Sequence, residues 1–371
     1  MGFGEVLGRY DAAEVGKWIE ETSPQRVARA LSADHLGLED FAALLSPAAA
    51  DHLEEMAARA HRLTVQRFGR NIFLYAPLYL SNVCSNSCAY CGFNVANPIP
   101  RRTLTLDEAE TDARVLVGQG FRHVLLLTGE APGVLGEDYL EAAVRRVRPL
   151  FDSVSLEVYP LSTDGYRRMA AAGVDGLTVY QETYDRVRYA SLHPAGRKRN
   201  FDFRLATPER AGAAGLRRIG IGALLGLGQF RTDAFFAGLH AAYLARHFWR
   251  SQVTVSFPRL RPAAGCFDPE HPVSDRQLVQ LICAMRLLLP DAGLVLSTRE
   301  SAELRDNLLP LGITQMSAGS CTAPGGYSDG GHEGEQFAID DDRTPAEIAR
   351  LIAAKGYEAV WKDWDRGFLG S

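Results

Sequence analysis

The sequence predicts a (β/α)8 barrel of the TIM type, preceded by an N-terminal helical extension over residues 1–70. After residue 70, eight short apolar runs bounded by turn residues alternate with helical stretches, at roughly 30 to 40 residues per unit. Strands alternating with helices at this spacing are typical of parallel α/β folds, and eight units close a barrel. A doubly wound open sheet is the alternative. No linker-like stretch divides residues 71–371, so we expect one barrel domain with a C-terminal helical tail.

The elements follow from the apolar pattern. Residues 1–70 are expected to be amphipathic helices, since alanine and leucine recur through residues 41–66. The expected strands are Ile72–Leu80, His123–Leu127, Val154–Val158, Gly176–Tyr180, Gly220–Leu224, Val253–Phe257, Leu294–Ser297 and Ile313–Ser317. Capping boxes, in which a hydroxyl residue and an acid or amide three positions later satisfy free backbone N–H groups, mark helix starts between and after them. They are Thr105/Glu108, Ser274/Gln277 and Thr344/Glu347.

Composition and charge exclude several classes of protein. The chain of 371 residues is 46% hydrophobic and 23% charged, as in ordinary globular enzymes. A net charge of −5 argues against a nucleic-acid surface, and the arginine-rich stretches 145–148 and 197–199 are expected to be solvated faces or local anion contacts. No apolar run reaches the roughly 18 residues of a membrane span, and residues 1–20 lack the apolar core of a secretory signal. We therefore expect a cytoplasmic protein without nucleic-acid or membrane partners.

Three of the six cysteines lie within eight residues, directly after the first expected strand. Cys84, Cys88 and Cys91 have the spacing C-x3-C-x2-C, with no fourth cysteine or histidine nearby. A closed structural zinc site needs four ligands, so a zinc knuckle is the weaker interpretation. Three thiolates suit a 4Fe-4S cluster in which one iron lacks a protein ligand and can bind another molecule. The carboxyl ends of barrel strands are also where barrel enzymes carry their chemistry.

The cysteine spacing, with an aromatic residue before the third cysteine, resembles the signature of the radical S-adenosylmethionine superfamily. The resemblance implies that the free iron binds the methionine end of S-adenosyl-L-methionine. One electron from the cluster then cleaves this cofactor to a 5′-deoxyadenosyl radical, which the protein aims and shields.

The same resemblance implies the cofactor contacts. Tyr90 falls where the superfamily packs an aromatic residue beside the adenine. Thr128-Gly129-Glu130 resembles the Gly-Gly-Glu motif that binds the methionine amino group, with Thr128 in place of the first glycine. Glu157 and Arg204 resemble positions that hold the ribose and the carboxylate. Without the resemblance, Glu157 would be a strand acid that faces the barrel interior or a loop.

Longer stretches resemble one family, the 2-iminoacetate synthases, which are the tyrosine lyases of thiamine thiazole biosynthesis. They are Leu78–Asn82, Val158–Thr163, Val179–Tyr184, Ser297–Glu300, Ser317–Ser320, Gly325–Tyr327 and Trp361–Asp365. The resemblance covers nearly the whole chain. It implies cleavage of the Cα–Cβ bond of L-tyrosine to 2-iminoacetate and 4-methylphenol, with 5′-deoxyadenosine and methionine as the other products.

The substrate must be clamped by its carboxylate so that its amino nitrogen faces the radical. A bidentate arginine suits this task, and Arg299, after the seventh expected strand, occupies the position that related amino-acid lyases use for it. Ser317 and Ser320 follow the eighth strand and are expected to assist. A salt bridge from Arg299 to Glu300 or Glu303 is the alternative, as are turn or capping roles for the serines.

Other interpretations and partners remain open at this stage. A tryptophan lyase of the same fold and a non-catalytic iron–sulfur redox sensor are the alternatives. A second cluster is not expected, because Cys266, Cys283 and Cys321 show no ligand spacing. The resemblance implies a flavodoxin- or ferredoxin-type electron donor, and a thiazole synthase that receives 2-iminoacetate. Asp340–Asp342 is expected to form a solvated turn after a possible strand at Gln336–Ile339.

Overall fold

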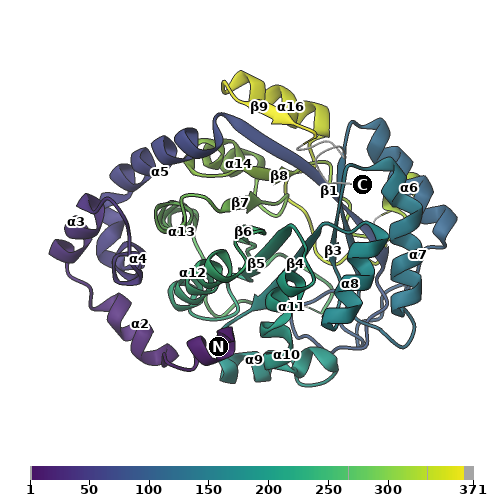
Figure 1. Ribbon diagram of the computed structural model, residues 1–371, viewed down its shortest axis with the longest axis horizontal. Helices are drawn as coiled ribbons and strands as arrows, with labels where there is room; N and C mark the ends of the chain where they lie inside the picture. The colour runs from purple at the N-terminus through teal and green to yellow at the C-terminus, as the bar shows by residue number, and fades with distance from the viewer. Residues whose placement is uncertain (1, 266, 332, 363–371) are drawn as a thin grey trace.

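A computed structural model describes residues 2–265, 267–331 and 333–362, and its centre is a closed ring of parallel strands (Figure 1). The strands are β1 (Asn71–Ser81), β2 (His123–Thr128), β3 (Ser153–Glu157), β4 (Gly176–Glu182), β5 (Arg218–Ala223), β6 (Gln252–Ser256), β7 (Gly293–Leu296) and β8 (Gln315–Ser317). Each strand pairs with the next along the chain, and β1 pairs with both β2 and β8. All eight expected strands are confirmed, and the open sheet is wrong because the ring has no edge.

A ninth strand, β9 (Glu358–Val360), was not expected from the sequence. It lies parallel to the first residues of β1, with Asn71 opposite Glu358 and Phe73 opposite Val360. Pairing of β1 with β2 begins only at Ala76, so the first residues of the 11-residue β1 are free to accept another strand. Three residues are too few to show a strand pattern, and β9 depends on its partner.

Helices surround the ring (Figure 1). Those of the barrel region are α6 (Leu106–Gly118), α7 (Glu137–Val147), α8 (Thr163–Ala172), α9 (Arg186–Leu192), α10 (Phe201–Leu205), α11 (Thr207–Ala213), α12 (Phe230–His247), α13 (Asp275–Leu288), α14 (Ala302–Leu308), α15 (Gly326–Asp329) and α16 (Pro345–Ala354). The three predicted capping boxes are confirmed at the starts of α6, α13 and α16. No helix of the described residues is long and apolar enough to cross a membrane.

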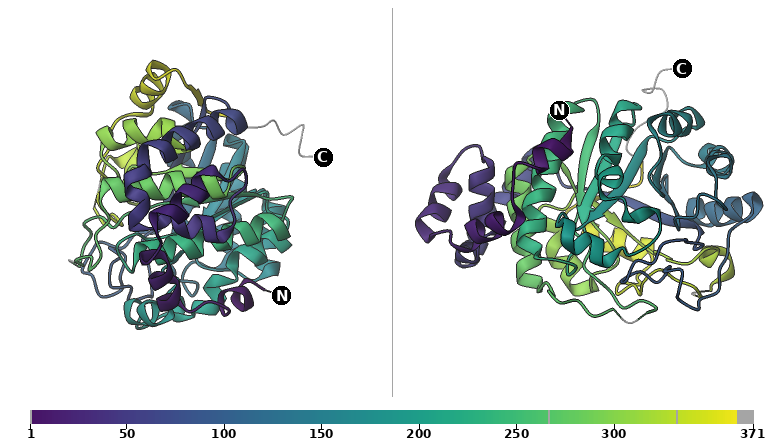
Figure 2. Two further views of the ribbon diagram at one scale, coloured as in Figure 1. Left: turned by 90° about the vertical axis from the view of Figure 1, so that its left-hand side faces the viewer. Right: turned by 90° about the horizontal axis from the view of Figure 1, so that it is seen from below.

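The N-terminal residues form five helices that pack on one side of the barrel (Figure 2). They are α1 (Phe3–Leu7), α2 (Ala12–Glu20), α3 (Pro24–Ser32), α4 (Leu38–Leu45) and α5 (Leu53–Phe68). The amide of Gln280 on α13 donates to the carbonyls of Leu44 and Ser46, both at 2.8 Å. Phe41 stacks near Phe235 of α12, in the same hydrophobic core as the barrel helices. The extension therefore covers the outer faces of α12 and α13.

Two histidines of α12 have structural surroundings. His240 is buried, stacks on Phe3 with 3.8 Å between ring centroids, and hydrogen-bonds Tyr184. His247 is exposed and bonds the carbonyl of Tyr243 at 2.8 Å. His240 therefore joins α1 to the barrel core.

Candidate active site

The loop that carries Cys84, Cys88 and Cys91, which we call the cysteine loop, runs from the end of β1 across the end of β2. The backbone and hydroxyl of Ser85 both donate to the carbonyl of Glu130, at 2.9 and 2.8 Å, and Asn86 donates to the Glu130 carboxylate at 2.8 Å. Gly129 is needed at this contact, because a Cβ there would lie 2.2 Å from the carbonyl oxygen of Val83. These bonds hold the cysteine loop over the mouth of the barrel.

Cys84, Cys88 and Cys91 all line one cavity at this mouth. Burial raises the pKa of Cys88 to about 12 and also raises that of Cys91, while the nearby Lys198 ammonium opposes both shifts. Metal binding would therefore have to displace the thiol protons. Among the described residues, no three cysteine, histidine or acidic side chains converge on a single ion site. The three thiols fit a polynuclear cluster, whose ligands bind different irons and need not converge.

Every residue expected to contact the cofactor lines the same cavity; these are Tyr90, Thr128, Gly129, Glu130, Glu157 and Arg204. Tyr90 is buried, and its hydroxyl bonds His193 at 2.8 Å. The hydroxyl of Thr128 is buried without a hydrogen-bond partner among the described residues. A buried hydroxyl without a partner is unfavourable, so this group fits a bound ligand that completes its hydrogen bonding.

Three charged residues of this cavity, Glu182, Lys198 and Arg261, were missed from the sequence. Glu182, at the end of β4, has φ of 72°, and is the one non-glycine residue with positive φ in the described chain. Its carboxylate pairs with Lys198 at 2.6 Å and Arg204 at 3.4 Å; burial opposes ionisation, but these cations hold its pKa below the ordinary value. Strained backbone of this kind is concentrated at functional sites. The position after a barrel strand was the only available signal, because Lys198 lies 16 residues away in sequence.

A second cavity lies beside the first and contains the three residues expected to bind substrate, Arg299, Ser317 and Ser320. Its other walls are mostly apolar and aromatic, and include Tyr75, Tyr79, Leu125, Leu127, Phe257 and Val295. Six residues line both cavities, namely Glu157, Tyr180, Pro258, Arg299, Gln336 and Phe337. The two cavities are therefore adjacent and share these six residues as a common wall. Ligands bound in the two cavities would lie next to each other.

The guanidinium of Arg299 lies 3.3 Å from the centroid of the Phe337 ring and donates to the carbonyl of Arg259 at 3.4 Å. Glu300 pairs instead with Arg259, and no ion pair joins Arg299 to Glu303 in the described chain. The salt-bridge alternative for Arg299 is therefore wrong. Burial lowers the pKa of Arg299, although nearby groups that include Glu157 oppose this shift.

The two serines differ. Ser317 accepts a hydrogen bond from the backbone N–H of Thr298 at 3.1 Å, so it supports the turn after β7. The hydroxyl of Ser320 is buried and has no partner within the described residues. Ser320 is therefore the serine whose hydroxyl is available to a substrate.

The segment that carries Gln336 and Phe337 is not the strand that the sequence suggested at Gln336–Ile339. It crosses the cavity mouth, where Tyr79 donates to Gln336 at 2.7 Å and Gln336 donates to the sulfur of Cys91 at 3.9 Å. The expected solvated turn at Asp340–Asp342 is wrong only for its middle residue, because Asp340 and Asp342 are exposed and Asp341 is buried.

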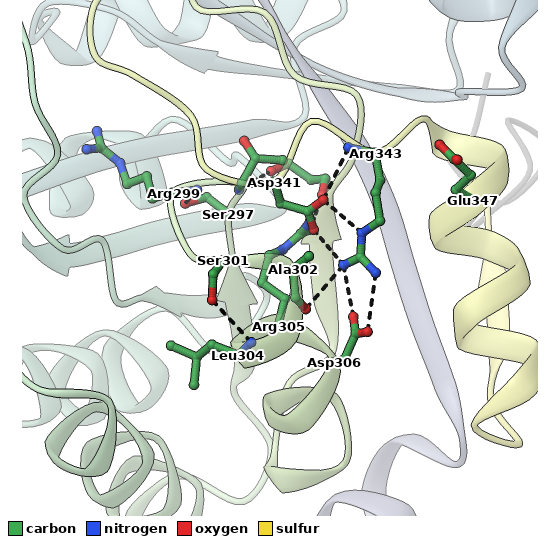
Figure 3. A network of polar contacts seen from close by, with 12 residues as sticks. Ser297, Arg299, Ser301, Ala302, Leu304, Arg305, Asp306, Asp341, Arg343 and Glu347 are labelled. Carbon is green, nitrogen blue, oxygen red and sulfur yellow. Dashed lines mark hydrogen bonds and ion pairs between the residues drawn. The ribbon is translucent and has the colours of Figure 1, made fainter.

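Asp341 anchors this segment in a network of polar contacts (Figure 3). Its carboxylate pairs with Arg305 of α14 and, at 2.7 Å, with Arg343. Arg305 also donates to the carbonyl of Ser317, and the backbone N–H of Asp341 donates to Thr298 at 3.2 Å. Figure 3 shows the guanidinium of Arg299 pointing away from this network.

Two of the remaining cysteines stand apart from this site. Cys283 and Cys321 are buried and do not line either cavity. Cys266 lies outside the described residues, as do the last three residues of the stretch Trp361–Asp365.

Comparison with known proteins identifies the family. Residues 78–234 match the Radical SAM superfamily, and residues 256–358 match the Biotin and Thiamin Synthesis associated domain. The chain is 47% identical over 369 residues to the 2-iminoacetate synthase of Escherichia coli, covering 99% of this chain and 98% of that one. The chain belongs to the 2-iminoacetate synthase family. It is also 48% identical over 340 residues to the enzyme of that name from Salmonella typhimurium, covering 91% and 90% of the two chains.

Solved structures agree with this family. The FeFe-hydrogenase maturase HydG from Carboxydothermus hydrogenoformans superposes with a TM-score of 0.83 and 32% identity, over 97% of this chain and 82% of that chain. Methylornithine synthase superposes with a TM-score of 0.74 at 22% identity, over 90% and 97%, and supports the fold alone. As a radical SAM enzyme, the family uses a 4Fe-4S cluster and S-adenosyl-L-methionine, and the first cavity contains a donor set that fits them.

Proposed function

We propose that this protein is a radical SAM lyase that cleaves the Cα–Cβ bond of L-tyrosine to 2-iminoacetate and 4-methylphenol for the thiazole of thiamine. The observation that carries the proposal is the shared wall of the two cavities, one lined by the three thiols and the other by Arg299. When bound, the cluster and S-adenosyl-L-methionine supply a 5′-deoxyadenosyl radical. The residues of this chain hold the two ligands and keep water away from the radical.

In the first cavity, Cys84, Cys88 and Cys91 would hold the cluster. The adenine would lie by Tyr90, the methionine amino group by Thr128-Gly129-Glu130, and the ribose by Glu157. Arg204 carries a positive charge for the carboxylate, although it already donates to the carbonyl of Tyr180 at 2.7 Å.

In the second cavity, Arg299 binds the tyrosine carboxylate and the Ser320 hydroxyl donates to it. The carboxylate binds at the wall that both cavities share, so the substrate nitrogen lies on the side of the radical. Leu125, Leu127 and Val295 pack against the ring. Removal of a hydrogen atom from that nitrogen gives a substrate radical, in which the Cα–Cβ bond breaks as the C=N bond of 2-iminoacetate forms. The side chain leaves as a 4-hydroxybenzyl radical, which takes one further electron from the electron donor and one proton to become 4-methylphenol.

The polar floor of the second cavity favours tyrosine over tryptophan. Three hydroxyl-bearing residues, Tyr75, Tyr180 and Ser256, line both this cavity and a neighbouring one whose lining is largely polar. A phenol hydroxyl can exchange hydrogen bonds with these groups, whereas the larger indole ring presents a carbon edge there.

Anaerobic turnover tests the reaction. Reconstituted protein, reduced with dithionite, is given S-adenosyl-L-methionine and either L-tyrosine or L-tryptophan. We expect 5′-deoxyadenosine, 4-methylphenol and glyoxylate from tyrosine, since the imine hydrolyses to glyoxylate in water. Cys88→Ala should abolish all three products. Release of 3-methylindole or its 2-carboxylate from tryptophan would favour the other lyase, and absence of 5′-deoxyadenosine would favour a redox sensor.

Two protein partners fit this function, and we propose that they meet the protein in the cytoplasm. A flavodoxin- or ferredoxin-type protein supplies the electron, and thiazole synthase receives 2-iminoacetate before water destroys it. Anaerobic co-purification of the two enzymes tests the second partner, and glyoxylate accumulation should fall when thiazole synthase and its other substrates are present.

A further inference from the structure

The surface beside the cysteine loop has a local excess of positive charge. Residues 186–199, which form α9 and the loop after it, include five arginines or lysines and no acid, whereas the whole chain has a net charge of −5. Three of the five are compensated, since Arg186 pairs with Asp202, Arg188 with Glu270, and Lys198 with Glu182. Arg197 and Arg199 remain.

Arg197 and Arg199 are exposed and make no ion pair within the described residues. They line a surface groove together with Pro160 and Phe203, and we call Arg197, Arg199 and Phe203 the basic face. Phe203 is 44% exposed, which is unusual for a phenylalanine. Charged residues around an apolar anchor are typical of a protein interface.

Exposed apolar side chains are concentrated at the same end of the barrel. Of the six large hydrophobic residues that are exposed in the described chain, four lie on segments that follow β1, β2 or β4; they are Val95, Val134, Val187 and Phe203. All three segments follow the carboxyl ends of barrel strands, and α9 and α10 after β4 lie next to each other (Figure 1).

The loop that carries Arg197 and Arg199 of the basic face is hydrogen-bonded directly to the cysteine loop. Ser87 donates its N–H to Ala195 at 3.3 Å, and Ala89 donates to Leu192 at 3.1 Å. From the other side, the N–H of Lys198 donates to the side chain of Asn86 at 3.1 Å. These contacts flank Cys88 on both sides, so the loop that lines the groove packs directly against the segment that carries this cysteine.

We infer that the basic face is the docking site of an acidic one-electron carrier protein that reduces the cluster. The inference rests on the proposed function. In the transfer the carrier loses one electron and the oxidised cluster gains it, and no bond or proton is exchanged. Complementary charge accelerates such encounters and makes them sensitive to ionic strength, and the short path through the 192–198 loop brings the carrier close to the cluster. An acidic carrier fits better than nucleic acid, because the protein as a whole is acidic.

The test compares two reductants on the variant Arg197→Glu/Arg199→Glu. One assay supplies electrons from a reduced bacterial flavodoxin with NADPH and flavodoxin reductase, and the other from dithionite; both measure 5′-deoxyadenosine. We expect the apparent KM for flavodoxin to rise by about tenfold or more and its dependence on salt to weaken. The rate with dithionite should not change. Arg197→Lys/Arg199→Lys should behave as the unaltered protein.

A matched control places the same charge reversal on the N-terminal extension, at the exposed residues Arg29 and Arg62. Arg29→Glu/Arg62→Glu should leave the flavodoxin KM unchanged. The inference is overturned if the basic-face variant keeps its flavodoxin KM, if both reductants lose rate equally, or if only binding of thiazole synthase is lost. Failure of the unaltered protein with dithionite would instead refute the proposed function itself.

Discussion

The buried carboxylate of Asp341 offers the sharpest test of how the segment over the cavity is held in place. Asp341 and Arg305 are both fully buried, and the pair ties residues 336–343 to α14 and to the end of β8. We predict that Asp341→Asn, which preserves shape but removes charge, leaves the Arg305 guanidinium buried without a counter-ion. Removal of one partner of a buried ion pair lowers the free energy of unfolding by about 3–5 kcal/mol.

The expected shift in melting temperature follows from chain length. An unfolding entropy of about 2.1 cal/mol/K per residue, over 371 residues, converts this cost into a decrease of roughly 4–6 °C. The effect also has a pH signature. Burial opposes ionisation of Asp341, but Arg343 and Arg305 hold its pKa below the ordinary value. The stabilisation that ionised Asp341 gives the folded protein is therefore complete at neutral pH. It disappears as the pH falls below about 4 and passes through the pKa of Asp341 in the folded protein.

Anaerobic thermal melts, followed by circular dichroism on reconstituted protein, measure the effect. Asp306→Asn is the matched control, because Asp306 pairs with the same Arg343 but both side chains are about a quarter exposed. Such a pair contributes up to about 1 kcal/mol, so its melting temperature should fall by no more than about 1 °C. Limited proteolysis should cut residues 336–343 faster in Asp341→Asn than in the unaltered protein, whereas Asp306→Asn should be cut at the unaltered rate.

Equal melting temperatures for Asp341→Asn and Asp306→Asn would refute this reasoning, because the two differ mainly in burial. So would an Asp341→Asn protein whose loss of stability relative to the unaltered protein does not shrink as the pH falls below about 4 and the native carboxylate takes up its proton.

Three further predictions concern the cavities. Arg299→Lys loses the bidentate geometry, so the KM for tyrosine should rise roughly tenfold or more in steady-state assays. Ser317→Ala should lower the free energy of unfolding by about 1 kcal/mol, because it removes the acceptor of the Thr298 N–H. Ser320→Ala should leave the free energy of unfolding unchanged and raise the KM for tyrosine. Burial raises the pKa of Glu157 to about 7, so the native protein should lose about 3 kcal/mol relative to Glu157→Gln between pH 4.5 and 7 in denaturant titrations without ligands.

Each of these has an outcome that contradicts it. An unchanged KM in Arg299→Lys would remove the arginine from the substrate site. Loss of stability in Ser320→Ala would mean that its hydroxyl has a structural partner. The sign for Glu157 is fixed by its raised pKa, since the unfolded chain ionises first as pH rises and stability falls until the folded group ionises as well. If the difference in unfolding free energy between the native protein and Glu157→Gln does not change with pH, the Glu157 carboxyl is in contact with water.

Much of the fold and of the cofactor site could be predicted because the signals are local. Each barrel strand is a short apolar run with its own boundaries, and the capping boxes act within four residues. Cys84, Cys88 and Cys91 belong to one loop, so covalent spacing alone keeps the thiols near each other. Their place after β1 then predicts the face of the barrel that holds the site.

The rest depends on residues that are distant in sequence. The run Asp340–Asp342 is polar and reads as solvated, yet Asp341 is buried because Arg305 and Arg343 supply its counter-charges. Gln336 reaches Tyr79 across 257 residues and Cys91 across 245. No local pattern encodes such contacts.

By itself, the sequence determined the barrel, the cysteine loop and the family, since these depend on periodicity and on short covalent spacing. Only the tertiary structure decided that two cavities share a wall at Glu157 and Arg299, and that Ser320 rather than Ser317 has a free hydroxyl among the described residues. It alone placed Arg197 and Arg199 beside the cysteine loop without an ion pair in the described part of the chain. The physical reason is that burial and charge compensation are properties of neighbours in space, which the fold brings together from separate parts of the chain.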